Sequence, residues 1–186
     1  AGEWKYSFTD LVEYDTNGNK IYYWVDEDVP EGFVKTLNGA NITNTYITPG
    51  SVVLQAKKQL SGDPRVLTAG EFSFQLKDSD GTVLQTKQND ANGNVTFDAI
   101  TYNLSDLGGA NSKTIVYTIS EVEGSDEHIV YDTAVYTATV TLTKVDNGVS
   151  VTKAYTDARN VETDLPIFTN EYTVEPTSVE IPFTRT

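Results

Sequence analysis

The sequence predicts an all-β protein made of sandwich-like domains in tandem. Apolar and polar residues alternate with a period of two in stretches such as residues 71–76 and 136–142, as in strands that bury one face. The chain has 11 Tyr and many Thr and Val, which are residue types that suit half-buried strands. A helical pattern is confined to one turn at residues 103–107, where two glycines stop it.

Asn-Gly pairs divide the predicted strands. They occur at Asn17-Gly18, Asn38-Gly39, Asn92-Gly93 and Asn147-Gly148. Asn-Gly adopts positive φ at low cost, so each pair predicts a hairpin turn. Two of the pairs lie in loops with several oxygen ligands, residues 15–19 and 90–94, which invite a calcium interpretation. Both loops lack the EF-hand ligand ladder and its terminal Glu, so the hairpin interpretation is preferred and no metal is expected.

Composition excludes several function classes. The net charge is -14, whereas binding to nucleic acid or to an anionic membrane needs clustered Lys and Arg. The chain has no cysteine, which excludes disulfides, thiolate nucleophiles and cysteine zinc sites. No apolar stretch approaches the roughly 20 residues that span a bilayer. We therefore expect no cofactor, no nucleic-acid partner and no membrane insertion in this segment.

The chain resembles itself at two places, which predicts two related domains. In each copy an aromatic strand ends on Glu, and a later strand carries an apolar-Thr-Asn-x-Tyr stretch. The matching segments are residues 21–27 with 115–121, and 42–46 with 168–172. The spacing between the two segments differs, so the copies are related domains rather than a short exact repeat.

This comparison predicts four parts along the chain. Residues 1–47 are the later part of a first domain, and residues 48–51 are a short linker that contains Pro49. Residues 52–173 form a complete second domain. Residues 174–186 are a linker followed by a first strand at 179–184.

Three polar residues are predicted to point into the second domain. In a strand over residues 52–60, Lys58 shares a face with Leu54 and Leu60. By the same parity Glu121 shares a face with Tyr117 and Ile119, and Asn170 shares one with Phe168 and Tyr172. A lone lysine on a core face costs several kcal/mol unless it is neutral or paired.

These three residue types can form an amide bond. An apolar site lowers the pKa of lysine and raises that of glutamic acid, so both can be neutral. Neutral Lys58 is then a nucleophile towards the side-chain carbonyl of Asn170. Protonated Glu121 would hydrogen-bond and polarise that carbonyl and move protons as ammonia leaves. Proximity in the folded core supplies the effective molarity.

Residues 51–172 resemble the streptococcal-pilin-type isopeptide domain of Gram-positive pilus backbones and adhesins. The matching stretches are residues 56–60, 70–76, 117–121, Tyr131-Asp132 and 168–172. The resemblance implies an immunoglobulin-like (Ig-like), Cna B-like β-sandwich. It also implies an isopeptide bond between Lys58 and Asn170, with Glu121 as the acid that forms it.

Residues 3–47 resemble the C-terminal half of a collagen-adhesin B-type (Cna B-type) repeat. The matching features are residues 4–11, Glu27 and residues 42–45. Glu27 and Asn44 stand where that family has its acid and its Asn. The family's lysine lies on an earlier strand that this sequence does not contain, so no bond is assigned in the first domain.

Alternatives remain open for each residue at the sequence level. Lys57 competes with Lys58, and parity favours Lys58. Glu121 is followed by an acidic stretch and would otherwise be a solvated strand end. Asn170 would otherwise be a turn residue. His128, the lone histidine, is interpreted as an exposed residue rather than part of a catalytic triad.

A group of aromatic residues in the first domain allows a second interpretation. Trp4 and Trp24, with Tyr22 and Tyr23, would form a sugar-binding platform, but core packing on alternate strand positions is the simpler explanation.

The sequence thus predicts a structural stalk segment rather than a turnover enzyme. We expect an extracellular, cell wall-anchored adhesin or pilus-like protein whose anchor lies outside this chain. Its expected partners are the neighbouring domains of the same array. The alternative is a ligand- or carbohydrate-binding module, whose partner would be a host matrix protein or a glycan.

Overall fold

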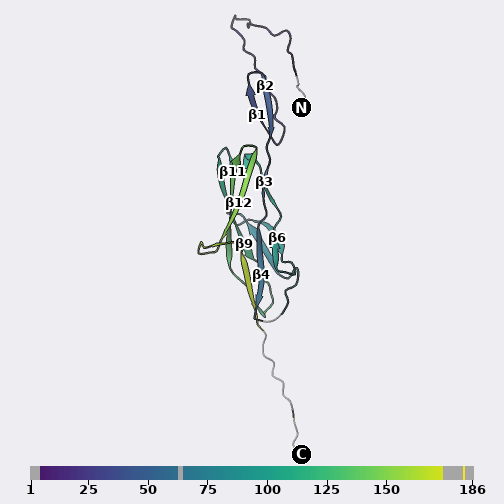
Figure 1. The fold of residues 1–186 in the computed structure, drawn as a ribbon, viewed down its shortest axis with the longest axis vertical. Helices are drawn as coiled ribbons and strands as arrows, with labels where there is room; N and C mark the ends of the chain where they lie inside the picture. Colours follow the sequence, from purple (N-terminus) through teal and green to yellow (C-terminus); the bar gives the residue numbers. More distant parts are fainter. Residues whose placement is uncertain (1–4, 63–64, 174–181, 183–186) are drawn as a thin grey trace, which may run out of the picture. The chain divides into compact units, whose positions relative to one another are not determined.

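The computed structural model describes residues 5–62, 65–173 and 182. The chain divides into two compact units, Ala1–Tyr46 and Ile47–Thr186, and Figure 1 labels some of the strands of each. Trp4 lies outside the described residues, and so does the expected strand at 179–184 apart from Pro182. Among the described residues, the regular structure consists of β-strands apart from one short 3₁₀ turn, which confirms the predicted all-β class.

The strands described in the first unit form an antiparallel hairpin, β1 (Phe33–Asn38) with β2 (Asn41–Tyr46). Its turn contains Gly39 at φ 61°, as the Asn-Gly pair predicts. Within the described residues of this unit no opposing sheet covers the aromatic run before β1. Trp24 is therefore 83% exposed and Tyr22 is 75% exposed, so the expected core packing of these rings is wrong for this chain.

The second unit is built from two main sheets. The four-stranded sheet has the order β10 (Ile129–Val130), β14 (Ile167–Tyr172), β4 (Gln55–Ser61) and β7 (Asn94–Thr96). The six-stranded sheet has the order β13 (Glu162–Thr163), β12 (Gly148–Thr156), β11 (Val135–Val145), β9 (Ser112–Glu121), β5 (Ser73–Lys77) and β6 (Val83–Gln88).

A smaller sheet completes the second unit. It pairs β3 (Gly50–Val52) with β8 (Ile100–Tyr102), so part of the expected linker lies in a strand. The 3₁₀ turn at Leu104–Leu107 follows β8, at the position of the predicted helical turn. Ile47, which the sequence prediction assigned to the first domain, is the first residue of the second unit and is buried.

The parallel pair of β4 and β14 is the feature that positions the candidate site. Antiparallel pairing dominates both sheets, but β14 lies parallel to β4, with Phe168 opposite Lys58 and Asn170 opposite Leu60. Figure 1 shows the two strands side by side, one from the start of the unit and one from its end. Strands that are distant in sequence are thus neighbours in the sheet.

The core follows the predicted alternation. Along β11, Ala138, Val140 and Leu142 are fully buried, and the threonines between them are not. Ile119 of β9 and Phe168 of β14 are fully buried as well. Burying each such side chain contributes about 1.5–3 kcal/mol, which is why one face of each strand is apolar.

Not every Asn-Gly pair makes a hairpin. Asn147-Gly148 lies at the tight connection between β11 and β12, as predicted. Asn92-Gly93 instead joins β6 to β7, which belong to different sheets. Gly93 has φ 82°, whereas neither Asn147 nor Gly148 has a positive φ, and the strands that flank Asn92 enter different layers.

Asn89 is a buried polar residue that sequence reasoning did not single out. Its Oδ1 accepts the Phe72 N–H at 2.7 Å, and its Nδ2 donates to the carbonyls of Thr68 at 2.8 Å and Asp90 at 2.9 Å. It ties the segment before β5 to the segment after β6. Asn89 is 3% exposed, so water cannot readily replace these bonds.

We expect Asn89→Ala to lower the free energy of unfolding by about 2–4 kcal/mol, because it leaves a buried N–H without an acceptor and removes two further hydrogen bonds. Urea denaturation followed by circular dichroism measures this change. The matched control is Gln88→Ala, whose exposed side chain makes one bond to the Gly70 carbonyl. Equal stability of the two variants would contradict the role given to Asn89.

Candidate functional site

Lys58 is buried in the second unit. It lies on β4 and is 1% exposed, with its Nζ 4.6 Å from the centre of the Phe72 ring. Lys57 points to the other face, where its Nζ donates to Asn92 O at 2.7 Å and Asn94 Oδ1 at 3.0 Å. The two neighbouring lysines therefore have different environments, one apolar and one formed by loop oxygens.

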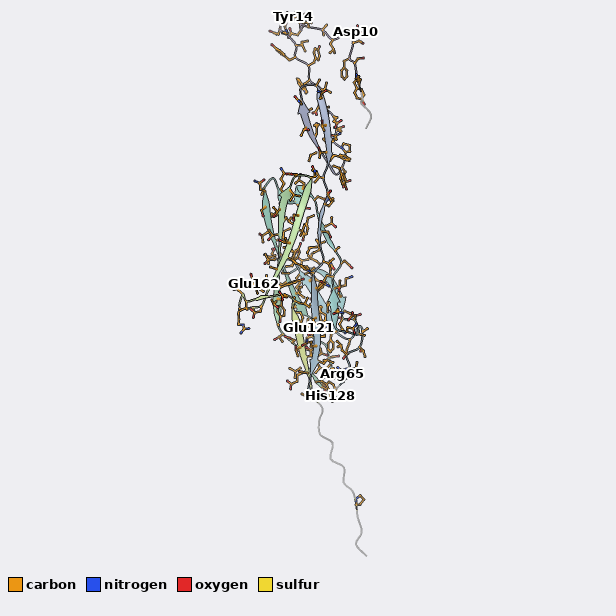
Figure 2. All side chains as sticks on the ribbon, in the orientation of Figure 1. Asp10, Tyr14, Arg65, Glu121, His128 and Glu162 are labelled. Atoms are coloured by element: carbon orange, nitrogen blue, oxygen red, sulfur yellow. The ribbon has the colours of Figure 1, made fainter. Side chains whose placement is uncertain are left out.

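Glu121 meets Lys58 from the opposite sheet. It is the last residue of β9, paired with Phe74 of β5. Its Oε2 lies 2.7 Å from Lys58 Nζ, and both side chains are fully buried. In Figure 2, Glu121 lies among the strands of the unit, while Arg65 and His128 lie near one end of it. The acidic stretch after Glu121 is exposed, but the Glu121 side chain is not.

Asn170 completes the group from β14. It is fully buried, and its Nδ2 donates to Glu121 Oε1 at 2.6 Å. Its Oδ1 accepts the main-chain N–H of Asp132 at 2.7 Å. We expected Glu121 to hydrogen-bond the Asn170 carbonyl. In the structure Glu121 contacts the amide nitrogen, and the carbonyl faces a main-chain donor.

The backbone of the parallel strands fixes this meeting. Because Phe168 is opposite Lys58, Asn170 lies two residues further along β14 on the same face. On the other side of β4, the Lys58 N–H donates to Gly93 O at 2.7 Å. A Cβ at Gly93 would lie 2.2 Å from Lys58 O, and Gly93 has φ +82°, so only glycine fits against this part of β4.

The apolar surroundings perturb both titratable groups. Burial lowers the pKa of Lys58 from its ordinary value of 10.5, although Glu121 opposes this change. Burial also raises the pKa of Glu121 from 4.5, against the hydrogen bonds from Lys58 and Asn170. Both shifts favour the neutral forms, because a buried charge loses its hydration.

One carboxyl group thus bridges an amine and an amide nitrogen. Glu121 contacts Lys58 with one oxygen and Asn170 with the other. This arrangement allows a proton to leave the amine and another to reach the amide nitrogen through the same residue. It is a geometry suited to exchange of one amide nitrogen for another.

The corresponding residues of the first unit are not joined in this way. Asn44 is exposed and lies opposite Lys35 in the β1–β2 hairpin. Glu27 has a buried Oε1 with no hydrogen-bond partner. Within the described residues no hydrogen bond connects Glu27 to Asn44.

The two Asp loops use their carboxylates internally. Asp15 Oδ1 accepts the N–H groups of Asn17 and Asn19, each at 2.8 Å. Asp90 Oδ1 does the same with Asn92 and Asn94, again at 2.8 Å. These bonds stabilise the two turns and account for the repeated residue pattern.

His128 lies in an exposed turn. Its Nδ1 is 3.3 Å from Asp126 Oδ1, and its side chain is 54% exposed. The imidazole ring contacts Asp126 and Tyr172, and neither residue type is the nucleophile of a hydroxyl triad.

Sequence reasoning missed two contributors to the site. Phe72 covers Lys58, and its ring meets Tyr131 edge-on at 6.2 Å. Asp132 contacts Asn170 through its main chain, and a main-chain contact leaves no residue-type signal. The alternation over residues 71–76 places Phe72 on the apolar face with Phe74 and Leu76, but it does not indicate that the Phe72 ring covers Lys58.

Two family models match the chain. The Spy0128-like isopeptide containing domain matches residues 54–173, and the Cna protein B-type domain matches residues 1–45. A collagen adhesin of Staphylococcus aureus is 51% identical over 47 residues, which are 25% of this chain and 4% of that protein. The chain therefore spans a small part of this relative.

The structure is also similar to pilin structures from Streptococcus pyogenes. The major pilin protein T-13 matches with a TM-score of 0.43 and 18% identity, over 67% of this chain and 55% of that one. A second major pilin matches with a TM-score of 0.41 and 15% identity, over 66% and 50%. The chain spans about half the length of these pilins.

The described residues contain no helix long and apolar enough to cross a membrane.

Of the two family matches, that of the second unit identifies the family of the chain, because its model covers more than half of the sequence. Through residues 54–173, the chain belongs to the family of Spy0128-like isopeptide containing domains.

Proposed function

We propose that this chain is a structural shaft segment of a bacterial cell-surface adhesin or pilus-like protein. Its second unit closes itself with an amide bond between Lys58 and Asn170, and Glu121 acts as the acid that forms this bond. The observation that carries the proposal is the buried contact of Glu121 with both other residues. The two family matches support extracellular display on a Gram-positive cell wall and contact with neighbouring domains of an array.

The proposed reaction occurs once in each molecule. Neutral Lys58 attacks the side-chain carbon of Asn170, Glu121 delivers a proton to Nδ2, and ammonia leaves. Because Glu121 contacts both Lys58 and Asn170, at 2.7 and 2.6 Å, folding supplies the proximity that the uncatalysed exchange lacks. Glu121 ends in the protonation state in which it began, but no new substrate enters, so the protein does not turn over.

The mechanical consequence follows from the strand order. β4 lies near the start of the second unit, β14 is the last strand among its described residues, and the two are parallel neighbours. A bond between them carries tension from Lys58 directly to Asn170, so the residues between them bear no load. Closing a loop of roughly 110 residues also removes entropy from the unfolded chain, worth about 4–5 kcal/mol.

We expect the intact chain, measured by mass spectrometry under denaturing conditions, to be lighter than its sequence mass by one ammonia. Lys58→Ala, Glu121→Gln and Asn170→Ala should each restore the full mass, because each removes the nucleophile, the acid or the electrophile. Lys57→Ala is the matched control and should keep the loss. A wild-type mass equal to the sequence mass would refute the bond.

We expect the bond to abolish extension of the second unit under force. In single-molecule stretching, Lys58→Ala should show an additional length gain of roughly 36–40 nm, from roughly 110 residues at about 3.3–3.6 Å each. The wild-type chain should lack this step, because its load bypasses those residues. Lys57→Ala should behave as wild type, and an equal gain in all three proteins would argue against a covalent path.

We expect the rate of bond formation to have a plateau in pH that falls on both sides. The reactive form, with neutral Lys58 and protonated Glu121, belongs to the state in which the pair holds one proton. A second proton charges Lys58 in acid, and loss of the proton removes the acid in alkali. Burial lowers the pKa of Lys58 from 10.5 and raises that of Glu121 from 4.5, so both limbs should lie between these values.

The measurement starts from unfolded protein isolated in urea whose mass shows no ammonia loss. Rapid refolding at each pH, followed by timed quenching and mass spectrometry, gives the rate. Circular dichroism at each pH verifies that the chain is folded. A rate that keeps rising with pH beyond 10.5, the ordinary lysine value, would contradict an essential protonated Glu121.

A further inference from the structure

The side-chain amide of Asn170 is held at both ends. Its Nδ2 donates to Glu121 Oε1 at 2.6 Å, and its Oδ1 accepts the Asp132 N–H at 2.7 Å. A main-chain N–H can only donate, so the atom that faces it must be the carbonyl oxygen. Asp132 therefore fixes which end of the amide faces Glu121.

The side chain of Asp132 holds this N–H in place. Its Oδ2 accepts the N–H of Thr169 at 2.7 Å, and its Oδ1 accepts the N–H of Ala134 at 2.8 Å. Residues 131–134 lie outside the strands, so no sheet ladder positions them. The carboxylate thus connects this segment to β14 at the residue directly before Asn170.

We propose that Asp132 is a positioning residue for the amide exchange: its main-chain N–H receives the charge that develops on Asn170 Oδ1, and its carboxylate holds that N–H against β14. The inference rests on the proposed function, because it concerns the same reaction.

Each bond change in this reaction has a place in the structure. The Lys58 Nζ lone pair forms the new bond to the Asn170 side-chain carbon, and the carbonyl electron pair moves to Oδ1. There it meets the Asp132 N–H, which is the role of an oxyanion-hole donor. The proton of Glu121 goes to Nδ2, the bond from carbon to Nδ2 breaks, and the carbonyl re-forms as ammonia departs. The proton lost by Nζ returns to Glu121.

If Asp132 acted only through its charge, its removal would change the pH dependence of bond formation in a different way from loss of positioning. The charged groups that face Lys58 are Glu121, Asp132 and Glu71, and those that face Glu121 are Lys58 and Asp132. The Asp132 charge raises the pKa of both members of the pair. Removing this charge alone would move both limbs of the pH profile to lower pH. Loss of positioning instead lowers the height of the plateau.

The test compares Asp132→Ala and Asp132→Asn in the whole chain, using the refolding assay. Asp132→Ala should lower the plateau rate about 10- to 100-fold, because small misplacements of reacting groups have effects of this size. Asp132→Asn keeps one acceptor oxygen without the charge and should be intermediate. The matched control is Asp126→Asn, whose carboxylate bonds the His128 N–H at 3.0 Å and does not contact Asn170.

A second measurement does not depend on the reaction. In Lys58→Met, which cannot form the bond, the Asp132 amide should resist hydrogen exchange because Asn170 Oδ1 accepts it. Adding Asn170→Leu should remove this protection, while the amides of β11 keep theirs.

Two results would overturn the inference: a wild-type plateau rate in Asp132→Ala, or Asp132 exchange that does not change with Asn170→Leu. A wild-type chain that never loses ammonia would overturn the proposed function instead. The exchange experiment would still decide whether Asp132 holds Asn170.

Discussion

The contact between Lys58 and Glu121 is the constraint on which the second unit depends. Both side chains are fully buried, and removing a charged or polar pair from water costs several kcal/mol unless each partner is satisfied. The two residues come from different sheets, so the pair fixes how the sheets pack against each other. Asn170 then donates to the remaining Glu121 oxygen, so both carboxyl oxygens of Glu121 have hydrogen-bond partners.

Strand parity predicted most of this arrangement. The period of two identified the core faces of β4, β9 and β14, because each strand places alternate residues in an apolar layer. It therefore gave the faces of Lys58, Glu121 and Asn170. Parity carries no information about which atoms of two side chains form a hydrogen bond. The sequence prediction therefore paired Glu121 with the Asn170 carbonyl, whereas in the structure Glu121 accepts from the Asn170 amide nitrogen.

The features that sequence did not predict depend on the main chain or on missing layers. Asp132 meets Asn170 through an N–H that every non-proline residue carries. Asn89 connects two loops by hydrogen bonds to their main-chain carbonyls, and the positions of these carbonyls are determined only by the fold. Trp24 follows a strand-like pattern, but a two-stranded hairpin provides no second layer to bury it.

The same buried contact explains why the proposed bond would form and persist. Before the reaction the core holds an amine and an acid whose charged forms are both disfavoured by burial. The amide product replaces the amine with a neutral group and keeps an oxygen for the Asp132 N–H to bond. Ammonia leaves to water, where it is dilute, so the reverse reaction lacks its nucleophile. Through the proposed bond, a buried polar group that is unfavourable in the folded core would become a covalent link that stabilises the fold.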